Sequence, residues 1–259
     1  MKIFILTYGR HNRQHTFNNL PKVIQDQTTL VVQAREKHLY KQYANILVLP
    51  SKIETISPTR QYVMKWAQKQ GIKKLCMLDD DLRFDIRRMD EKGKFYVASE
   101  KDVVKLFKEI EKRLDKYAHV GVLAREGGNR VLEPVRECTR MMRVLAYQVD
   151  TFFENKINFD RVIHQQDFDV TLQLLRKGFK NLVLCEWVQG QGSSNAPGGC
   201  SHYRTIESQS SNASKLAELH PGFVKVVEKE TKGAWGGGKR LDVLVQWKKA
   251  YESANVKGN

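Results

Sequence analysis

The sequence has no long apolar segment, no internal repeat and no low-complexity stretch. No run of eighteen apolar residues occurs in its 259 residues, so we expect no transmembrane helix. The N-terminal segment MKIFILTYGR holds only a short apolar stretch, and no small-residue cleavage site follows it. It therefore predicts a buried first strand rather than a signal peptide.

Cysteines are few and widely spaced. The four cysteines, Cys76, Cys138, Cys185 and Cys200, form no CxxC pair. Cys76 and Cys185 lie inside apolar runs typical of strands. This pattern favours reduced thiols in a cytoplasmic protein over a disulfide framework or a zinc site.

Acidic residues are fewer than basic ones. The sequence has 29 Asp and Glu and 44 Lys and Arg, which gives a formal net charge of +15. Such a charge attracts polyanions and speeds their encounter. It favours a nucleic-acid partner, although a solubilising surface or a site for a phosphorylated small ligand also accounts for it. No basic amphipathic helix with a Trp or Phe face is evident, so no membrane partner is expected.

Apolar runs alternate with segments of helical period, which predicts an α/β fold with a mixed, mostly parallel sheet flanked by helices. Strands are expected at residues 2–8, 29–34, 45–50, 73–81, 119–124, 143–153 and 181–187. Helices are expected at residues 16–26, 59–70, 103–117, 168–178, 206–219 and 221–230. We predict one domain over residues 1–205 and a helical, basic appendage over 206–259 packed on it, in a monomer.

Three consecutive carboxylates follow an apolar strand in LCMLDDDLRF, residues 75–84. Open α/β sheets bind ligands at the carboxyl ends of their strands. Asp79 and Asp81 are two residues apart, so on an extended chain they reach the same face and one hard cation. The alternative is an acidic turn that caps a following helix. The same motif also occurs in nucleases, nucleotidyltransferases and phosphatases.

A second motif narrows the choice among these classes of enzyme. The segment HQQDFDVTLQLLRKGFKNLVLCEW, residues 164–187, together with ILTYGRHNR, the helix opened by PTRQ and the DDD strand, resembles the GT-A glycosyltransferases over most of residues 1–205. Within that group the chain is similar to the phage-encoded TET-associated glycosyltransferases, which are thought to add sugars to hydroxymethylated cytosines in DNA. The resemblance implies a Rossmann-like GT-A fold, a UDP-sugar donor such as UDP-glucose, a DNA acceptor and a place in the host cytoplasm.

The resemblance also implies roles in donor binding. Asp79 and Asp81 match the carboxylates that hold Mn²⁺ or Mg²⁺ against the donor diphosphate, and Asp80 would contact the ribose or sugar. The loop after the first strand would hold the base and ribose through Thr7, Tyr8, Gly9 and Arg10. Arg60 would contact the base or diphosphate. A glycine-rich loop at residues 188–205 would supply His202 as a further metal ligand, with Tyr203 and Arg204 at the diphosphate.

For catalysis, Asp167 matches the general base of inverting members, and Asp169 would orient it. Gln166 departs from the family pattern, where Glu is usual. If the base lies elsewhere, or if the enzyme is retaining, the assignment of Asp167 fails. A purely structural alternative is that both aspartates stabilise the helix N-terminus. His164 is a second candidate near the acceptor.

Five arginines between two predicted strands form the candidate DNA contact: Arg125, Arg130, Arg136, Arg140 and Arg143. They suit a phosphate backbone, with Met141 or Tyr147 beside an unstacked base. Pairing with local glutamates is the alternative. The tail offers further phosphate contacts through Lys232, Lys239 and Arg240, with Trp235.

The leading interpretation is a metal-dependent glycosyltransferase that moves a sugar from a UDP-sugar to a hydroxyl on 5-hydroxymethylcytosine DNA, or on its glycosylated form. A surface polysaccharide or protein acceptor is the alternative within the same fold. A metal-dependent nuclease and a non-catalytic nucleic-acid-binding protein are alternatives of another class.

Overall fold

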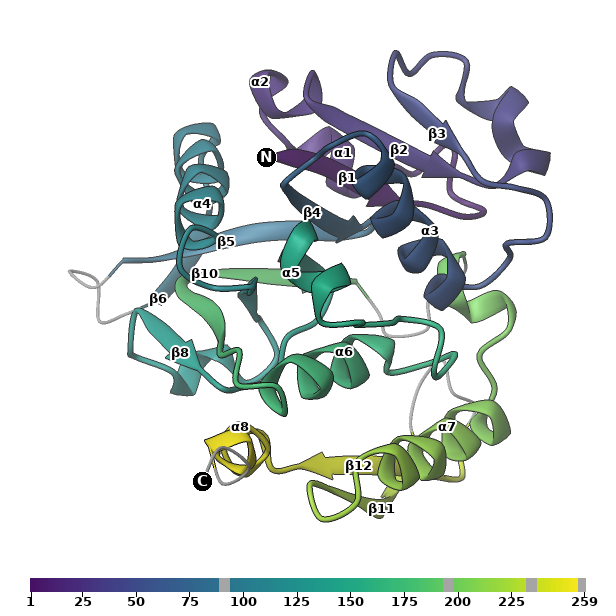
Figure 1. Ribbon diagram of the computed structural model, residues 1–259. Coiled ribbons are helices and arrows are strands. Elements are labelled where there is room, and N and C mark those ends of the chain that lie inside the picture. The colour runs from purple at the N-terminus through teal and green to yellow at the C-terminus, as the bar shows by residue number, and fades with distance from the viewer. Residues whose placement is uncertain (89–93, 193–197, 232–236, 256–259) are drawn as a thin grey trace.

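The computed structural model describes residues 1–88, 94–192, 198–231 and 237–255 (Figure 1). These residues form a ten-stranded sheet in the order β3-β2-β1-β4-β9-β7-β10-β5-β6, with β8 also paired to β10, and a separate two-stranded sheet. The strands of the large sheet are β1 (Lys2–Leu6), β2 (Thr28–Val32), β3 (Ile46–Val48), β4 (Lys74–Asp79), β5 (Leu82–Arg88), β6 (Lys94–Val97), β7 (His119–Ala124), β8 (Val135–Glu137), β9 (Val144–Gln148) and β10 (Asn181–Gln191).

Both strand directions occur in the large sheet. β1 is parallel to β2 and β4, β2 to β3, and β7 to β10. The pairs β4–β9, β7–β9, β10–β5, β5–β6 and β10–β8 are antiparallel. The predicted α/β class with a mixed sheet flanked by helices is confirmed.

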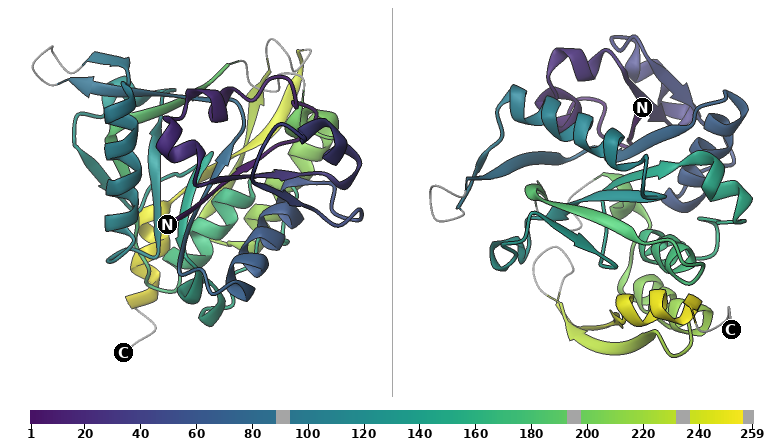
Figure 2. Two further views of the ribbon diagram at one scale, coloured as in Figure 1. Left: turned by 90° about the horizontal axis from the view of Figure 1, so that it is seen from above. Right: turned by 60° about the vertical axis from the view of Figure 1, so that its left-hand side comes forward.

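Helices cover both faces of this sheet (Figures 1 and 2). They are α1 (His15–Asn19), α2 (Lys22–Gln25), α3 (Ile56–Lys69), α4 (Glu100–Arg113), α5 (Val149–Glu154) and α6 (Gln166–Leu175). Because successive side chains of a strand point to opposite faces, β1 contributes to two cores. Ile3 and Ile5 pack with α2 and α4, whereas Phe4 and Leu6 pack with α3, α5 and α6.

The C-terminal segment adds a further layer outside α6 (Figure 1). It contains α7 (Ile206–Leu219), the antiparallel hairpin β11 (Val224–Glu230) and β12 (Lys239–Val245), and α8 (Trp247–Asn255). A third apolar cluster joins this layer to α6 through Leu172 and Leu175 of α6, Leu216 of α7 and Ala250 of α8. Helix α6 is therefore packed on both sides, against the sheet and against the C-terminal layer.

Two predicted elements were wrong in part and a third was wrong. The helix expected at 16–26 is divided into α1 and α2, because Pro21 lacks the amide hydrogen that a continuous helix needs. The strand expected at 143–153 ends at Gln148, where α5 begins. The helix expected at 221–230 is the strand β11, which pairs with β12 along its whole length.

β5 and β6, the last two strands on one side of the large sheet, were not predicted from the sequence. Strand β5 carries charged side chains among its apolar ones, and the fold satisfies the buried ones locally. Arg87 donates to the carbonyl of Gly128 at 2.9 Å, and Asp85 forms an ion pair with Arg125 at 3.5 Å. In the part of the chain that the structure describes, no helix is long and apolar enough to cross a membrane.

Candidate active site

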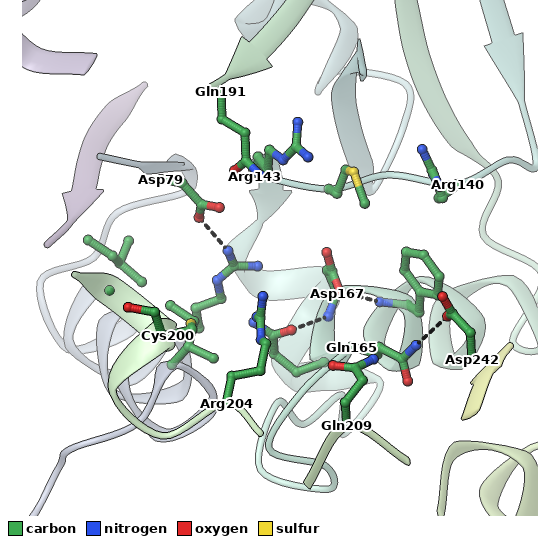
Figure 3. Close-up of a pocket in the computed structure, with 18 of the residues that line it drawn as sticks. Asp79, Arg140, Arg143, Gln165, Asp167, Gln191, Cys200, Arg204, Gln209 and Asp242 are labelled. Atoms are coloured by element: carbon green, nitrogen blue, oxygen red, sulfur yellow. Dashed lines mark hydrogen bonds and ion pairs between the residues drawn. The ribbon is translucent and has the colours of Figure 1, made fainter. Parts of the chain in front are cut away.

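A cavity of about 650 Å³ opens at the carboxyl ends of β1 and β4. Its walls come from β4, α3, the start of α6, the loop at residues 198–204 and the β11–β12 hairpin. The residues that surround it come from distant parts of the chain (Figure 3). This is the edge of the sheet at which open α/β folds bind their ligands.

The three consecutive aspartates all line this cavity. Asp79 is the last residue of β4, and Thr16 fixes the turn that follows. The Thr16 amide donates to the Asp80 carbonyl at 3.0 Å, and the Thr16 hydroxyl donates to the Asp79 carbonyl at 2.6 Å. The hydroxyl also accepts from the Leu82 amide at 2.7 Å. Since the next element is β5, the triplet does not cap a helix.

Two arginines balance these carboxylates. Arg10 forms ion pairs with Asp80 and, at 2.9 Å, with Asp81. Arg60 of α3 donates from one terminal nitrogen to Asp79 at 2.9 Å. Burial raises the pKa of Asp79 above its ordinary value while Arg60 opposes the rise, and burial raises the pKa of Asp80 to about 6 against the effect of Arg10.

Arg60 has spare hydrogen-bonding capacity. The residue is only 3% exposed, yet its Nε and second terminal nitrogen donate to no group among the described residues. A buried donor without a partner costs free energy, typically 1–3 kcal/mol and more for charged groups. Because Arg60 lines the cavity, an anionic ligand there would supply the missing acceptors.

The predicted third metal ligand, His202, does not line the cavity that the aspartates line. His202 instead packs on Tyr8, with ring centroids 4.6 Å apart, and its Nε2 would lie 2.8 Å from a Cβ at Gly9. The described residues contain no group of three or more His, Cys, Asp or Glu side chains arranged to hold a metal. The carboxylates of Asp79 and Asp81 still fit a hard cation that arrives with a diphosphate, since Mg²⁺ binds through one or two carboxylates plus substrate phosphates.

Three of the four predicted donor residues after β1 stabilise the loop rather than line the cavity. Thr7 bonds to the Tyr40 hydroxyl at 3.2 Å. Tyr8 accepts from Arg35, and the Gly9 amide donates to Glu36 at 2.9 Å. Leu6 and the predicted Arg10 are the residues of this region that line the cavity in the described structure.

The loop at residues 198–204 forms another wall. The Gly199 amide donates to the Tyr8 carbonyl at 2.8 Å, and Arg10 lies so close that a Cβ at Gly198 would be 2.6 Å from it. Gly198 has φ +97°, a conformation that L side chains rarely adopt. Glycine is therefore required where this loop crosses Arg10.

Of the residues predicted in that loop, Arg204 lines the cavity and Tyr203 does not. The Tyr203 hydroxyl accepts from the Ile56 amide at 3.0 Å, which attaches the loop to the start of α3. The Tyr203 ring stacks on His164 with centroids 5.6 Å apart. His164 is 1% exposed, and burial together with Arg204 lowers its pKa to about 4, so it is a packed, neutral imidazole.

The two aspartates of α6 have different surroundings. Asp167 lines the cavity and makes no ion pair with any described residue, and Figure 3 shows it between Asp79 on one side and Asp242 on the other. Asp169 is fully buried outside the cavity, where it accepts from His220 at 2.7 Å and Gln173 at 2.8 Å. Asp167 is thus placed to meet a ligand, whereas Asp169 joins α6 to the residue after α7.

The five candidate arginines are not brought together. Arg140 and Arg143 line the cavity. Arg143 also pairs with Glu126 at 3.0 Å, and its carbonyl accepts from the Asp79 amide at 3.0 Å. Arg140 is exposed and forms no ion pair with the described residues.

The other three arginines lie outside the cavity lining. Arg125 pairs with Asp85, as described for β5, and Arg130 is exposed. Arg136 pairs with Glu133 at 3.1 Å, which is the local pairing left open by the sequence. Lys232 and Trp235, named for the tail, lie outside the described residues.

The hairpin wall was not predicted from the sequence. Its cavity-lining residues include Lys229, Arg240, Asp242 and Leu244, and Trp247 at the start of α8 lines the cavity beside them. A signal was present, because a glycine-rich segment separates two runs rich in β-branched and apolar residues, VKVVEKE and KRLDVLV.

The chain was compared with family models, with curated protein sequences and with solved structures. A model of the family "TET-Associated Glycosyltransferase" matches residues 1–199. No curated protein sequence matches the chain. Similar solved structures include mannose-1-phosphate geranyltransferase from Thermus thermophilus, at 12% identity and a TM-score of 0.45 over 73% of this chain and 75% of that one.

Two further solved structures are similar to a comparable degree. GalNAc-T7 with UDP, GalNAc and Mn²⁺ has 12% identity and a TM-score of 0.43, over 73% of this chain and 42% of that one. A cytidylyltransferase from Leptospira borgpetersenii serovar Hardjo-bovis has 11% identity and a TM-score of 0.43, over 84% and 91%.

The family match covers more than half of the chain and includes the aspartate triplet, Arg60 and Asp167. It decides against the nuclease and the non-catalytic binding protein that the sequence left open. The chain belongs to the TET-associated glycosyltransferase family and is a nucleotide-sugar glycosyltransferase.

Proposed function

We propose that this protein is a metal-dependent enzyme that transfers a sugar from a UDP-sugar, UDP-glucose first among the candidates, to a hydroxyl on DNA that carries 5-hydroxymethylcytosine or its glycosylated form. The observation that carries the proposal is one cavity lined by three carboxylates, a buried arginine with unpartnered donors and a separate carboxylate without an ion pair.

In the proposed reaction the acceptor oxygen attacks the anomeric carbon of the donor, and the bond from that carbon to the β-phosphate oxygen breaks. Asp167 takes the proton from the acceptor hydroxyl, which makes that oxygen a better nucleophile. The pair of electrons from the broken bond leaves with UDP. This assignment is that of an inverting enzyme.

Charge on the departing diphosphate would be met by Arg60 and Arg204, both of which line the cavity. Asp79 and Asp81 would hold the cation, which when bound neutralises the diphosphate. Asp80 keeps a buried carboxylate oxygen without a hydrogen bond among the described residues, so it is suited to accept from a ribose or sugar hydroxyl. Arg10 holds Asp80 and Asp81 in place for these roles.

The DNA acceptor is supported by the family and by the formal net charge of +15. A polyanion gains from such a charge in rate of encounter and in affinity. An acceptor hydroxyl on a base must be turned out of the duplex or approached through the major groove to reach a carboxylate inside a cavity.

The test is mass spectrometry of hydroxymethylcytosine-containing duplex DNA after incubation with a panel of UDP-sugars and Mn²⁺ or Mg²⁺. We expect the mass of one sugar to be added to the modified base, and Asp81→Ala to abolish the addition. Transfer to a polysaccharide or a protein, with none to DNA, would overturn the acceptor assignment.

A further inference from the structure

The cavity has two halves with different charge. On one side of Asp167, Arg10, Arg60, Arg143 and Arg204 line the cavity with the aspartate triplet, and Glu126 pairs with Arg143, so four cations stand against four carboxylates. On the other side three cations, Arg140, Lys229 and Arg240, stand against the single carboxylate of Asp242. Lys229 and Arg240 share that carboxylate, at 3.7 and 3.3 Å. Figure 3 shows Arg140 and Asp242 on the same side of Asp167, opposite Asp79. The excess of positive charge therefore lies in the half that the donor residues leave open.

One face of the hairpin is turned toward this half. Alternate residues of a strand share a face, which places Arg240, Asp242 and Leu244 together on β12. Lys229 lies directly across from Arg240 in the register of the two strands. Val243 and Val245, the alternate residues of β12, pack against the apolar cluster beneath the hairpin and also border the cavity. The hairpin is thus anchored through its valines, and the side of β12 that brings charge and exposed apolar surface to the cavity, Arg240, Asp242 and Leu244, is its cavity face.

Apolar surface accompanies the charge on this face. Leu244 is 60% exposed although it lines the cavity, and Trp247 packs edge-on against Phe168, with ring centroids 5.2 Å apart. Phe168 directly follows Asp167. A nucleic-acid strand is bound by two features together, cations that contact its phosphates and an apolar, aromatic wall that packs against a base. Both are present here.

The hairpin is also connected to the residue that carries the proposed base. Asp242 accepts from the Gln165 side chain at 3.3 Å. Gln165 has φ 57°, a left-handed conformation, and it is the residue from which α6 begins, two residues before Asp167. A contact made on the hairpin is therefore next to the proposed site of proton transfer.

We propose that the cavity face of the hairpin, together with Trp247 of α8, is the acceptor subsite and that it binds a DNA strand, with Lys229 and Arg240 on the phosphates and Leu244 and Trp247 against the base that carries the hydroxyl. This subsite lies beyond residues 1–199, the part that matches the family model. It rests on the proposed function for the identity of the acceptor.

The experiment measures equilibrium binding of a fluorescent duplex containing hydroxymethylcytosine, in the presence of UDP, at several salt concentrations. Lys229→Glu is expected to weaken binding by about tenfold and to lower the slope of log affinity against log salt by about 1, as for one lost phosphate contact. Lys108→Glu is the matched control, since Lys108 is an exposed lysine of α4 outside the cavity.

The apolar wall is tested separately by Leu244→Asp, with Leu132→Asp as its control. Both leucines are 60% exposed, and only Leu244 lines the cavity. We expect Leu244→Asp to weaken DNA binding by about tenfold and to leave UDP binding unchanged. Equal effects of each variant and its control, or no DNA binding by the wild type, would overturn the subsite.

The two proposals fail in different ways. If the wild type binds DNA through this face but adds no sugar to it, the proposed function is wrong and the subsite stands. If sugar is added while Lys229→Glu and Leu244→Asp behave like their controls, the subsite is wrong and the proposed function stands.

Discussion

Arg60, which is buried, and Asp79, whose side chain is 30% exposed, form an ion pair in the wall of the cavity, with 2.9 Å between the terminal nitrogen and the carboxylate oxygen. Helix α3 supplies the arginine and strand β4 the aspartate. The pair uses only part of the guanidinium, since two of its nitrogens donate to no described residue. This arrangement leaves the arginine oriented by one anion and able to bind a second.

The first prediction follows from those two nitrogens. Arg60→Lys keeps the charge but loses the planar set of donors, so UDP should bind more weakly by about 10- to 100-fold, the equivalent of one or two hydrogen bonds to a charged group. Calorimetric titration with UDP measures this change. Arg113→Lys, which alters an arginine paired with Glu109 on α4, should leave UDP affinity as it is. An unchanged affinity in Arg60→Lys would remove Arg60 from the donor site.

Asp167→Asn tests the proposed general base. The variant should lower kcat by about 10²- to 10⁴-fold, because the amide cannot accept the proton, and should leave UDP affinity nearly unchanged. Asp150→Asn is a suitable control, since Asp150 is in the first turn of α5 as Asp167 is in the first turn of α6. Steady-state kinetics on modified DNA provide the readout. A kcat close to that of the wild type would mean that the base lies elsewhere.

Asp169 should matter for stability rather than for chemistry. Asp169→Ala removes the acceptor for His220 and Gln173 in a fully buried site, so we expect the free energy of unfolding to fall by about 3–5 kcal/mol. Denaturant unfolding measures the loss. The variant should retain kcat per folded molecule at low temperature, and a selective loss of kcat without loss of stability would return Asp169 to a catalytic role.

His119 should make the protein sensitive to acid. The residue is fully buried and stacked on Tyr147, with centroids 4.2 Å apart, and burial lowers its pKa to about 3. The unfolded chain takes up a proton near the ordinary value of 6.5, whereas the folded protein does not. Stability is therefore complete above about pH 6.5 and is lost as the pH falls toward 3, by up to about 1.4 kcal/mol per pH unit.

His119→Phe isolates this contribution. The difference in unfolding free energy between wild type and variant should change by about 1.4 kcal/mol for each pH unit between 6 and 4. Urea unfolding at several pH values measures it. A difference that does not vary with pH would show that the imidazole is protonated in the folded protein.

Much of the fold could be predicted from the sequence because it depends on local patterns. The apolar runs that contain Ile3, Leu30, Leu47 and Met77 are strands, and the helix that begins near Pro58 is α3. By contrast, β11 was expected to be a helix. It is a strand because it pairs with β12, and this pairing joins residues as far apart as Val224 and Val245. Such a pairing is not visible in either segment alone.

In the candidate site, too, some residues could be predicted from local motifs and others depend on distant neighbours. Asp79, Arg60 and Asp167 were identified because each stands at a strand or helix end with a recognisable motif, and all three line the cavity. His202 and Asp169 share similar motifs, but their neighbours differ: Tyr8 holds one and His220 the other. The direction in which a side chain points depends on these packed neighbours, which the motif does not specify.

The central claim is that the aspartate triplet and Arg60 bind the diphosphate of a nucleotide-sugar with a divalent cation. Calorimetric titration of the wild type and Asp81→Asn with UDP, in Mn²⁺ and then with a chelator, tests it most directly. We expect UDP to bind the wild type in Mn²⁺ and to lose at least tenfold in affinity on chelation or in Asp81→Asn. UDP binding of equal strength under all of these conditions would contradict the claim.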